Sequence, residues 1–316
     1  MFALDTHEPQ VESADGLKIW AAQAGRSAKE APTIVFVPGF ASSALLFDHQ
    51  FRDEELLSKY CLVRHPSHVY HVYNGCLLRS VIIYTLAQIT YEPRGQGRSD
   101  SPTKDEQWTS LCHAQDFAAV CAYYDASKVF AAGWSAGCTI ISDVFEHDFG
   151  HLLAGLIYLA GVPYLELFPK VNFPTVGKYY QPIKEASTGD THGQIIANFL
   201  NICIWKPNRE AMSYTFRSAL IGTVATTPTT VRLHSQTKHA QNPAKLLAAI
   251  PNYEALFIVG EQEEVVKPDA SVALFQEMFP RLDAVRVPEA GHAVYWERPA
   301  ETNTAIVKFV DRVVKA

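Results

Sequence analysis

The chain has 316 residues, of which 48% are hydrophobic, and its 27 Lys and Arg against 33 Asp and Glu give a formal net charge of −6. A chain of about 300 residues buries roughly three quarters of the surface that it exposes when unfolded, so a large core is available. The composition therefore excludes a disordered or fibrous protein. The acidic balance, without any run of Lys or Arg, argues against a nucleic-acid partner.

We recognise neither a targeting segment nor a cysteine motif in this sequence. The start of the chain has no basic segment followed by an apolar one, so we expect no secretory signal and a cytoplasmic protein. The longest apolar stretch, residues 81–89, is shorter than the about 20 residues that a membrane span needs. Cys112, Cys121 and Cys138 lie in helix-like, partly apolar patterns and are expected to be buried thiols, and no C-x-x-C pair indicates a zinc site.

The predicted elements alternate along the chain. Two short extended stretches flank the Asp15-Gly16 turn, and a β-branched apolar run over 33–37 predicts a buried strand. Helices are predicted over 42–60, 106–124, 137–146, 270–279 and 301–314, and further strands over 129–133, 156–160, 255–260 and 284–287. Strands that alternate with helices indicate an α/β fold with a mostly parallel sheet covered on both faces.

The alternation stops between residues 163 and 242, a stretch rich in Pro, Thr and Lys with short helical patterns. We interpret this stretch as an inserted helical lid that shapes a substrate pocket, between the two core parts 1–162 and 243–316. Its aromatic residues either favour an apolar acyl or aromatic substrate or simply pack the lid. They are Tyr164, Phe168, Phe173, Tyr179, Tyr180, Phe199 and Trp205.

A G-x-S-x-G motif, Gly133-Trp134-Ser135-Ala136-Gly137, follows one predicted strand directly and precedes a predicted helix. A serine on such a sharp turn has its hydroxyl lifted clear of the sheet, and the glycines allow close backbone approach. The helix that begins there directs N–H groups at developing negative charge. This context predicts a nucleophilic Ser135 in preference to an ordinary Gly-Ser turn.

A nucleophilic serine needs a base that is oriented by a carboxylate. His292 follows the predicted strand 284–287, and Glu263 follows the strand 255–260. Both positions lie just past the carboxyl end of a strand, which is where sites form in open α/β sheets. We therefore predict His292 as the base and a carboxylate that follows the strand 255–260 as its acid, with Glu261, Glu263, Glu264 and Asp269 as the candidates.

These residues make the sequence resemble the α/β-hydrolase fold family, in its lid-bearing branch of esterases, peroxidase-like enzymes and carbon–carbon hydrolases. The order Ser135, Glu263, His292 matches the family order of nucleophile, acid and histidine, and residues 91–100 resemble its D-x-R-G-x-G-x-S segment. The resemblance implies an oxyanion hole made by the backbone N–H groups of Phe40 and Ala136. Two departures are Glu in place of the usual Asp at position 263, and Pro38-Gly39 in place of the usual His-Gly.

The predicted function is hydrolysis of a carboxylic ester or related carbonyl compound through an acyl-enzyme on Ser135, without a metal or organic cofactor. By resemblance, Ser at the nucleophile position argues against the dehalogenase and epoxide hydrolase branches, which use a carboxylate there. Two different functions stay open: cofactor-free perhydrolase or lyase chemistry on the same triad, and ligand binding by an inactive protein. The small-molecule substrate and the oligomeric state stay open as well.

Residues 63–88 are anomalous for this fold, because they separate the predicted helix 42–60 from the strand that leads into residue 91. Omission of these 26 residues joins Leu62 to Ile89 in a compact strand pattern. The codons of Val63-Arg64 and Gln88 can match the ends of an intron, so we interpret the segment as a translated intron, with a genuine insertion as the alternative. Its histidines, His65, His68 and His71, do not have a recognised metal-ligand spacing.

Overall fold

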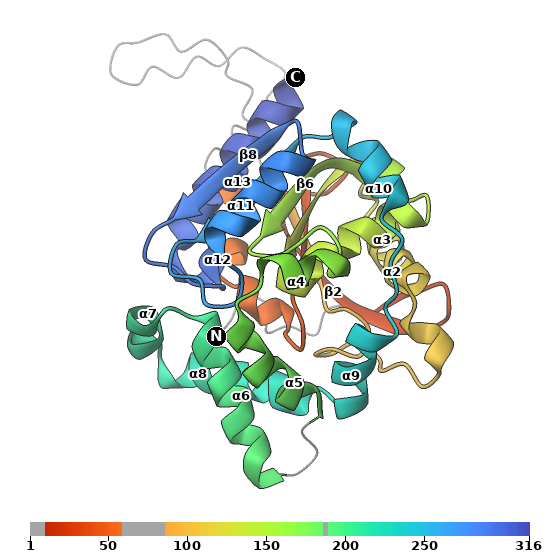
Figure 1. Ribbon diagram of the computed structural model, residues 1–316. Helices are drawn as coiled ribbons and strands as arrows, with labels where there is room; N and C mark the ends of the chain where they lie inside the picture. Colours follow the sequence, from red (N-terminus) through yellow and green to blue (C-terminus); the bar gives the residue numbers. More distant parts are fainter. Residues whose placement is uncertain (1–9, 59–85, 186–188) are drawn as a thin grey trace.

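The computed structural model describes residues 10–58, 86–185 and 189–316 (Figure 1). They form an eight-stranded sheet in the order β1-β2-β4-β3-β5-β6-β7-β8, in which β1, β2 and β4 pair antiparallel and the pairs from β4 to β8 are parallel. The strands are β1 (Gln10–Glu12), β2 (Lys18–Gly25), β3 (Thr33–Val37), β4 (Ala87–Tyr91), β5 (Val129–Trp134), β6 (Leu153–Leu159), β7 (Ala255–Gly260) and β8 (Leu282–Val287).

Helices cover both faces of the sheet. Phe309 in α13 packs edge-on against Phe130 in β5, and Phe275 in α11 packs against Tyr158 in β6. Phe130 pairs with Gly155, and side chains alternate along a strand, so Phe130 and Tyr158 face opposite sides. The helices are α1 (Glu54–Ser58), α2 (Ser110–Tyr123), α3 (Ile140–Glu146), α4 (Phe168–Val171), α5 (Gly177–Glu185), α6 (Gly189–Cys203), α7 (Lys206–Ala211), α8 (Tyr214–Thr226), α9 (Thr229–Thr237), α10 (Ala244–Ala249), α11 (Pro268–Met278), α12 (Val294–Glu297) and α13 (Pro299–Lys315).

The central strands are buried along their whole length, as expected where helices cover both faces. The predicted strands 33–37 and 255–260 coincide with β3 and β7, and the predicted helix 301–314 lies within α13. The α/β class and the mostly parallel sheet are thus confirmed.

The segment between β6 and β7 is helical, and α4 to α9 fall within the predicted lid, 163–242. In Figure 1 the helices α5 to α9, coloured green to cyan, lie together at one end of the molecule, away from α11 and α13. We call residues 163–242 the helical insertion.

The single helix predicted over 42–60 is wrong. The structure has 3₁₀ turns over Ala44–Phe47 and Gln50–Arg52, followed by the short α1. Asp53 separates the last two with an extended ψ of 118°. Its Oδ1 accepts a hydrogen bond from the Leu56 N–H at 3.0 Å, and its Oδ2 accepts one from Asn303 Nδ2 at 2.9 Å. A side chain that bonds the backbone locally competes with a continuous helix.

Most of the anomalous segment 63–88, namely residues 63–85, lies outside the described residues. His65, His68 and His71 are in this part. Ala87 and Gln88 are described, and they form the buried beginning of β4.

Cys112, Cys121 and Cys138 are buried free thiols, as predicted. Within the described ranges, no helix combines the length and the apolarity that crossing a bilayer requires.

Candidate active site

Ser135 lies on a strained turn directly after β5. Its φ of +52° is in the left-handed region, which a non-glycine residue rarely adopts, and a 3₁₀ turn over Ser135–Thr139 leads into α3. The flanking glycines are required by close backbone contacts. A Cβ on Gly137 would lie 2.3 Å from the Val37 carbonyl oxygen, and one on Gly133 would lie 2.5 Å from the Cys138 nitrogen. The motif thus has the tight strand–turn–helix geometry that its sequence predicts.

The His292 ring lies between Ser135 and Glu263. Its Nε2 is 2.8 Å from Ser135 Oγ, and its Nδ1 is 2.9 Å from Glu263 Oε2. The side chains of His292 and Glu263 are 3% and 0% exposed. A carboxylate only accepts, so the tautomer with the proton on Nδ1 satisfies both contacts, and Nε2 is then free to accept the serine proton. The three predicted residues are therefore brought together.

Glu263 is the carboxylate nearest the histidine because of the loop that follows β7. Its Oε1 accepts hydrogen bonds from the backbone N–H groups of Val265 at 2.9 Å and Val266 at 3.4 Å, which leaves Oε2 for His292. The alternative acids point elsewhere. Glu261 and Asp269 form exposed ion pairs with Arg286, and Glu264 is exposed.

Two contacts that the sequence did not indicate fix the loop that carries His292. Trp134 Nε1 donates to the His292 carbonyl at 2.8 Å, and Glu297 Oε1 accepts from the Gly291 N–H at 2.8 Å. Burial raises the pKa of Glu297, and hydrogen bonds from Asn208, Trp205 and Gly291 oppose that rise. Glu297 belongs to the short helix α12, and no sequence pattern distinguishes it from Glu301, an exposed glutamate in α13.

The residues predicted for the oxyanion hole flank the nucleophile. Phe40 and Ala136 line the same pocket as Ser135 and His292. The loop that carries Phe40 approaches the nucleophile closely, since a Cβ on Gly39 would lie 3.1 Å from Ser135 Cβ. A side chain at position 39 would therefore crowd Ser135 and Trp134 at this approach.

The Phe40 loop is held by the segment that resembles D-x-R-G-x-G-x-S. The Ser42 N–H donates to Gln96 Oε1 at 2.9 Å, and the Ala44 N–H donates to Glu92 Oε1 at 3.1 Å. Glu92 also accepts hydrogen bonds from the guanidinium of Arg98 at 2.9 and 3.1 Å. The sequence indicated this segment only by resemblance and gave no sign of its contacts with the loop.

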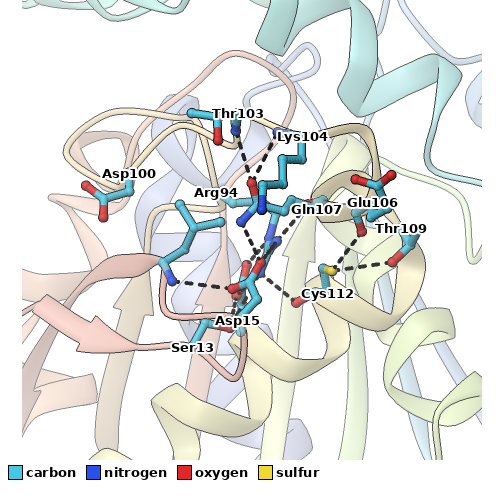
Figure 2. A network of polar contacts seen from close by, with 12 residues as sticks. Ser13, Asp15, Arg94, Asp100, Thr103, Lys104, Glu106, Gln107, Thr109 and Cys112 are labelled. Carbon is cyan, nitrogen blue, oxygen red and sulfur yellow. Dashed lines mark hydrogen bonds and ion pairs between the residues drawn. The ribbon is translucent and has the colours of Figure 1, made fainter.

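Arg94 connects the segment 91–100 to the core through hydrogen bonds and ion pairs. Its side chain is fully buried and pairs with Asp116 in α2 at 2.6 Å and with Asp15 at 3.0 Å. It also donates to the Gln107 carbonyl at 2.7 Å. Figure 2 shows Arg94 at the centre of this network, with Asp15 and Gln107 around it. The network gives Arg94 a structural role, and Arg94 does not line the pocket that contains Ser135.

The catalytic pocket, as we call the space lined by Ser135 and His292, has mostly apolar walls. The helical insertion contributes Phe168, Tyr180 and Phe199 to its lining. Of the remaining aromatic residues singled out in the sequence, Tyr164, Phe173 and Tyr179 pack against the main core. In the part of the chain that the structure describes, no three His, Cys, Asp or Glu side chains are grouped so that they could hold a metal ion.

A family model described as the alpha/beta hydrolase family matches residues 34–305. The chain belongs to the alpha/beta hydrolase family. Its fold is similar to that of a protein designated an aryl esterase from Burkholderia cenocepacia, with 25% identity, coverage of 98% of this chain and 100% of that chain, and a TM-score of 0.77. It is also similar to the esterase RhEst1 from Rhodococcus sp. ECU1013 (20% identity, 98% and 100% coverage, TM-score 0.75).

A bromoperoxidase from Bacillus anthracis has the same fold at 15% identity, with 96% and 98% coverage and a TM-score of 0.72. No curated protein matches this α/β hydrolase. Family membership and the esterase neighbours support a hydrolase that acts on a small molecule.

Proposed function

We propose that this α/β hydrolase is a serine esterase, which cleaves a carboxylic ester or a related carbonyl compound through an acyl-enzyme on Ser135. The observation that carries the proposal is the pair of contacts made by His292, to Ser135 Oγ at 2.8 Å and to Glu263 Oε2 at 2.9 Å. A serine hydroxyl is a weak nucleophile at neutral pH until an oriented base takes its proton.

In the first half-reaction, Ser135 Oγ attacks the carbonyl carbon of the ester while His292 Nε2 takes the hydroxyl proton. The carbonyl oxygen becomes an oxyanion, which accepts hydrogen bonds from the backbone N–H groups of Phe40 and Ala136. The bond to the alcohol oxygen then breaks, and the alcohol leaves with the proton from His292. Glu263 keeps the ring oriented and stabilises the imidazolium that forms.

In the second half-reaction, water gives its proton to His292 Nε2 and attacks the acyl carbon. Collapse of the second tetrahedral intermediate returns the proton to Ser135 Oγ and releases the carboxylic acid. No step needs a metal ion or an organic cofactor. The helical insertion acts as the lid of the two core parts, 1–162 and 243–316, and its apolar wall favours an apolar acyl or aromatic group over a charged one.

Peroxide could replace water in the second half-reaction, which would make the protein a perhydrolase; the bromoperoxidase neighbour supports only the shared fold. The same residues could also serve lyase chemistry, or the pocket could bind a ligand without catalysis. Products separate these cases, since an esterase forms the free acid, a perhydrolase forms the peracid when hydrogen peroxide is added, and a binding protein forms neither.

The test is covalent labelling with a fluorophosphonate, which reacts with an activated serine. We expect labelling of the unchanged chain and none of Ser135→Ala. Ser142→Ala is a matched control, because Ser142 is buried in the adjacent helix α3 without lining the catalytic pocket, and it should label normally. A folded chain that resists the probe would overturn the proposal.

A further inference from the structure

The two ends of the helical insertion are joined to each other and to helix α3 by one side chain. Gln241, near the end of the insertion, accepts a hydrogen bond at its Oε1 from the N–H of Leu165, near the start, at 3.0 Å. Its Nε2 donates to Asp143 Oδ1 in α3 at 2.5 Å. The amide of Gln241 therefore holds both ends of the insertion at the same point of the core.

Asp143 binds a second residue of the insertion with its other oxygen. Its Oδ2 lies 2.6 Å from His239 Nε2, and the side chains of Asp143 and His239 are 0% and 4% exposed. As a carboxylate, Asp143 only accepts, so His239 Nε2 carries the proton of this contact. His113 in α2 packs against the His239 ring, with the ring centroids 4.5 Å apart. Both oxygens of Asp143 are thus occupied by the end of the insertion.

The same contacts reach the turn that carries Ser135. Gln241 Nε2 also donates to the Thr139 carbonyl at 2.8 Å, and Thr139 Oγ1 donates to the Ala136 carbonyl at 2.8 Å. Thr139 is the last residue of the turn that begins at Ser135, and both Thr139 and Leu165 line the catalytic pocket. The insertion is therefore attached at the edge of the catalytic pocket, close to the proposed nucleophile.

The burial of Asp143 makes its partners necessary. Burial raises the pKa of Asp143, and the neighbouring His239 and Gln241 oppose that rise. A buried carboxylate that loses its hydrogen-bond partners is strongly destabilising, whereas one that keeps them is tolerated. Asp143 therefore favours the position of the insertion in which His239 and Gln241 both reach it.

The position of the insertion affects the wall of the catalytic pocket more than the reacting groups. Phe168, Tyr180 and Phe199 of the insertion line the pocket. The proposed nucleophile, base, acid and oxyanion-hole residues all belong to the two core parts, 1–162 and 243–316. An apolar wall binds the substrate about equally before and during the reaction, so loss of the wall raises KM more than it lowers kcat.

We propose that Asp143 is a positioning residue, which holds the helical insertion over the catalytic pocket through both ends of the insertion. This inference rests on the proposed esterase function. With p-nitrophenyl butyrate as the probe, Asp143→Ala should raise KM by about 10-fold, the loss expected when one aromatic side chain no longer contacts the substrate. The kcat of this variant should change by less than about threefold.

Hydrogen–deuterium exchange separates positioning from a general loss of stability. In Asp143→Ala, the amides of α8 and α9 should exchange about 10-fold faster, while those of α11 and α13 keep their rates. Asp143→Asn should recover most of both effects, because its amide can accept from Gln241 and donate to the His239 ring. Ser142→Ala removes a buried hydroxyl of α3 that has no hydrogen-bond partner among the described residues, and it should leave KM and exchange unchanged.

Gln241→Ala removes the link between the two ends of the insertion, and it decides the question if Asp143→Ala does not fold. It should raise KM and speed exchange in α8 and α9 in the same way. An unchanged KM, a loss confined to kcat, or exchange that rises equally in α11 and α13 would overturn the role of Asp143. If the fluorophosphonate labels Ser135 in the same samples, the esterase function stands in each of these cases. If the unchanged chain folds and is not labelled, both proposals fail.

Discussion

Glu297 accepts a hydrogen bond from the backbone N–H of Trp205 at 2.9 Å, and this contact joins helix α12 to the helical insertion. Its carboxylate also accepts from Asn208 Nδ2 at 2.9 Å and from the Gly291 N–H at 2.8 Å. Nearby, the Ala293 N–H donates to the Cys203 carbonyl at 3.0 Å. The loop that carries His292 is thus tied on both sides of the histidine to residues 203–208.

We predict that Glu297→Ala slows catalysis by about 10- to 100-fold, because a small displacement of His292 from Ser135 is enough for such a loss. Steady-state kinetics and the rate of fluorophosphonate labelling measure this, and the loss should fall on kcat more than on KM. Glu297→Gln should also be impaired, since an amide has only one oxygen for three donors. Glu289→Gln, a change of an exposed carboxylate of the same loop, is the control. Unchanged kcat in Glu297→Ala would refute this role.

The assignment of Glu263 as the acid that orients His292 can be tested with two matched variants. Glu263→Gln should reduce kcat by about 10³- to 10⁴-fold, since a neutral side chain neither holds the Nδ1–H tautomer nor stabilises the imidazolium. Glu261→Gln removes a carboxylate that pairs with Arg286 at the surface, so its kcat should match that of the unchanged chain. Comparable losses in both variants, or a loss in Glu261→Gln alone, would show that Glu263 is not the acid.

Stability should fall in mild acid because of His113. Burial lowers the pKa of His113 well below its usual value, and nearby His239 and Arg94 lower it further. The native state therefore keeps His113 neutral while the unfolded chain takes up a proton below about pH 6.5, so stability that is present above that pH is lost as the pH falls. The loss approaches about 1.4 kcal/mol per pH unit until the native pKa is reached.

Urea unfolding at pH 7.5 and pH 5 measures this effect. His113→Phe replaces the ring with one that does not titrate, and it also removes Nε2, which has no hydrogen-bond partner among the described residues. The variant should lose less stability between the two pH values than the unchanged chain. His151→Gln, at an exposed position, should behave like the unchanged chain. Equal pH dependence in all three would contradict the assignment.

We propose that residues 63–88 do not belong to the working protein. Gln88 is fully buried in β4, and its Oε1 lacks a hydrogen-bond partner within the described part of the chain. Deletion of 63–88 would put Leu62 in its strand position and remove a buried unsatisfied group, which typically costs about 1–3 kcal/mol.

The deletion variant should therefore melt cooperatively and at a higher temperature than the full chain. Calorimetry of the two proteins measures this, and the mature transcript should lack the corresponding 78 nucleotides. A deletion variant that does not fold, beside a full chain that does, would show that the segment is a genuine insertion.

The sheet and the sharp turn that carries Ser135 could be predicted from the sequence, because both depend on local sequence patterns. The apolar run of β3 and the glycines around Ser135 specify their conformation within a few residues. The break in the predicted helix 42–60 could not be found in this way. It depends on Asp53, whose side chain bonds Asn303, a residue distant in sequence.

The candidate active site could likewise be predicted only in the part that depends on local sequence patterns. The order of Ser135, Glu263 and His292 is visible in the sequence, but the preference for Glu263 over its neighbours depends on two backbone N–H groups that only the folded loop directs at it. Glu297 has no sequence signal, because its burial results from contact with the helical insertion.

The most direct test of the proposed mechanism is to trap the acyl-enzyme. The full chain is mixed with p-nitrophenyl acetate, quenched in acid after a fraction of a turnover, digested and analysed by mass spectrometry. We predict one acetyl group on the peptide that contains Ser135, absent from Ser135→Ala and accumulating with a burst of p-nitrophenol. Ester turnover by a folded chain with no adduct, or with the adduct on another residue, would contradict the proposed role of Ser135.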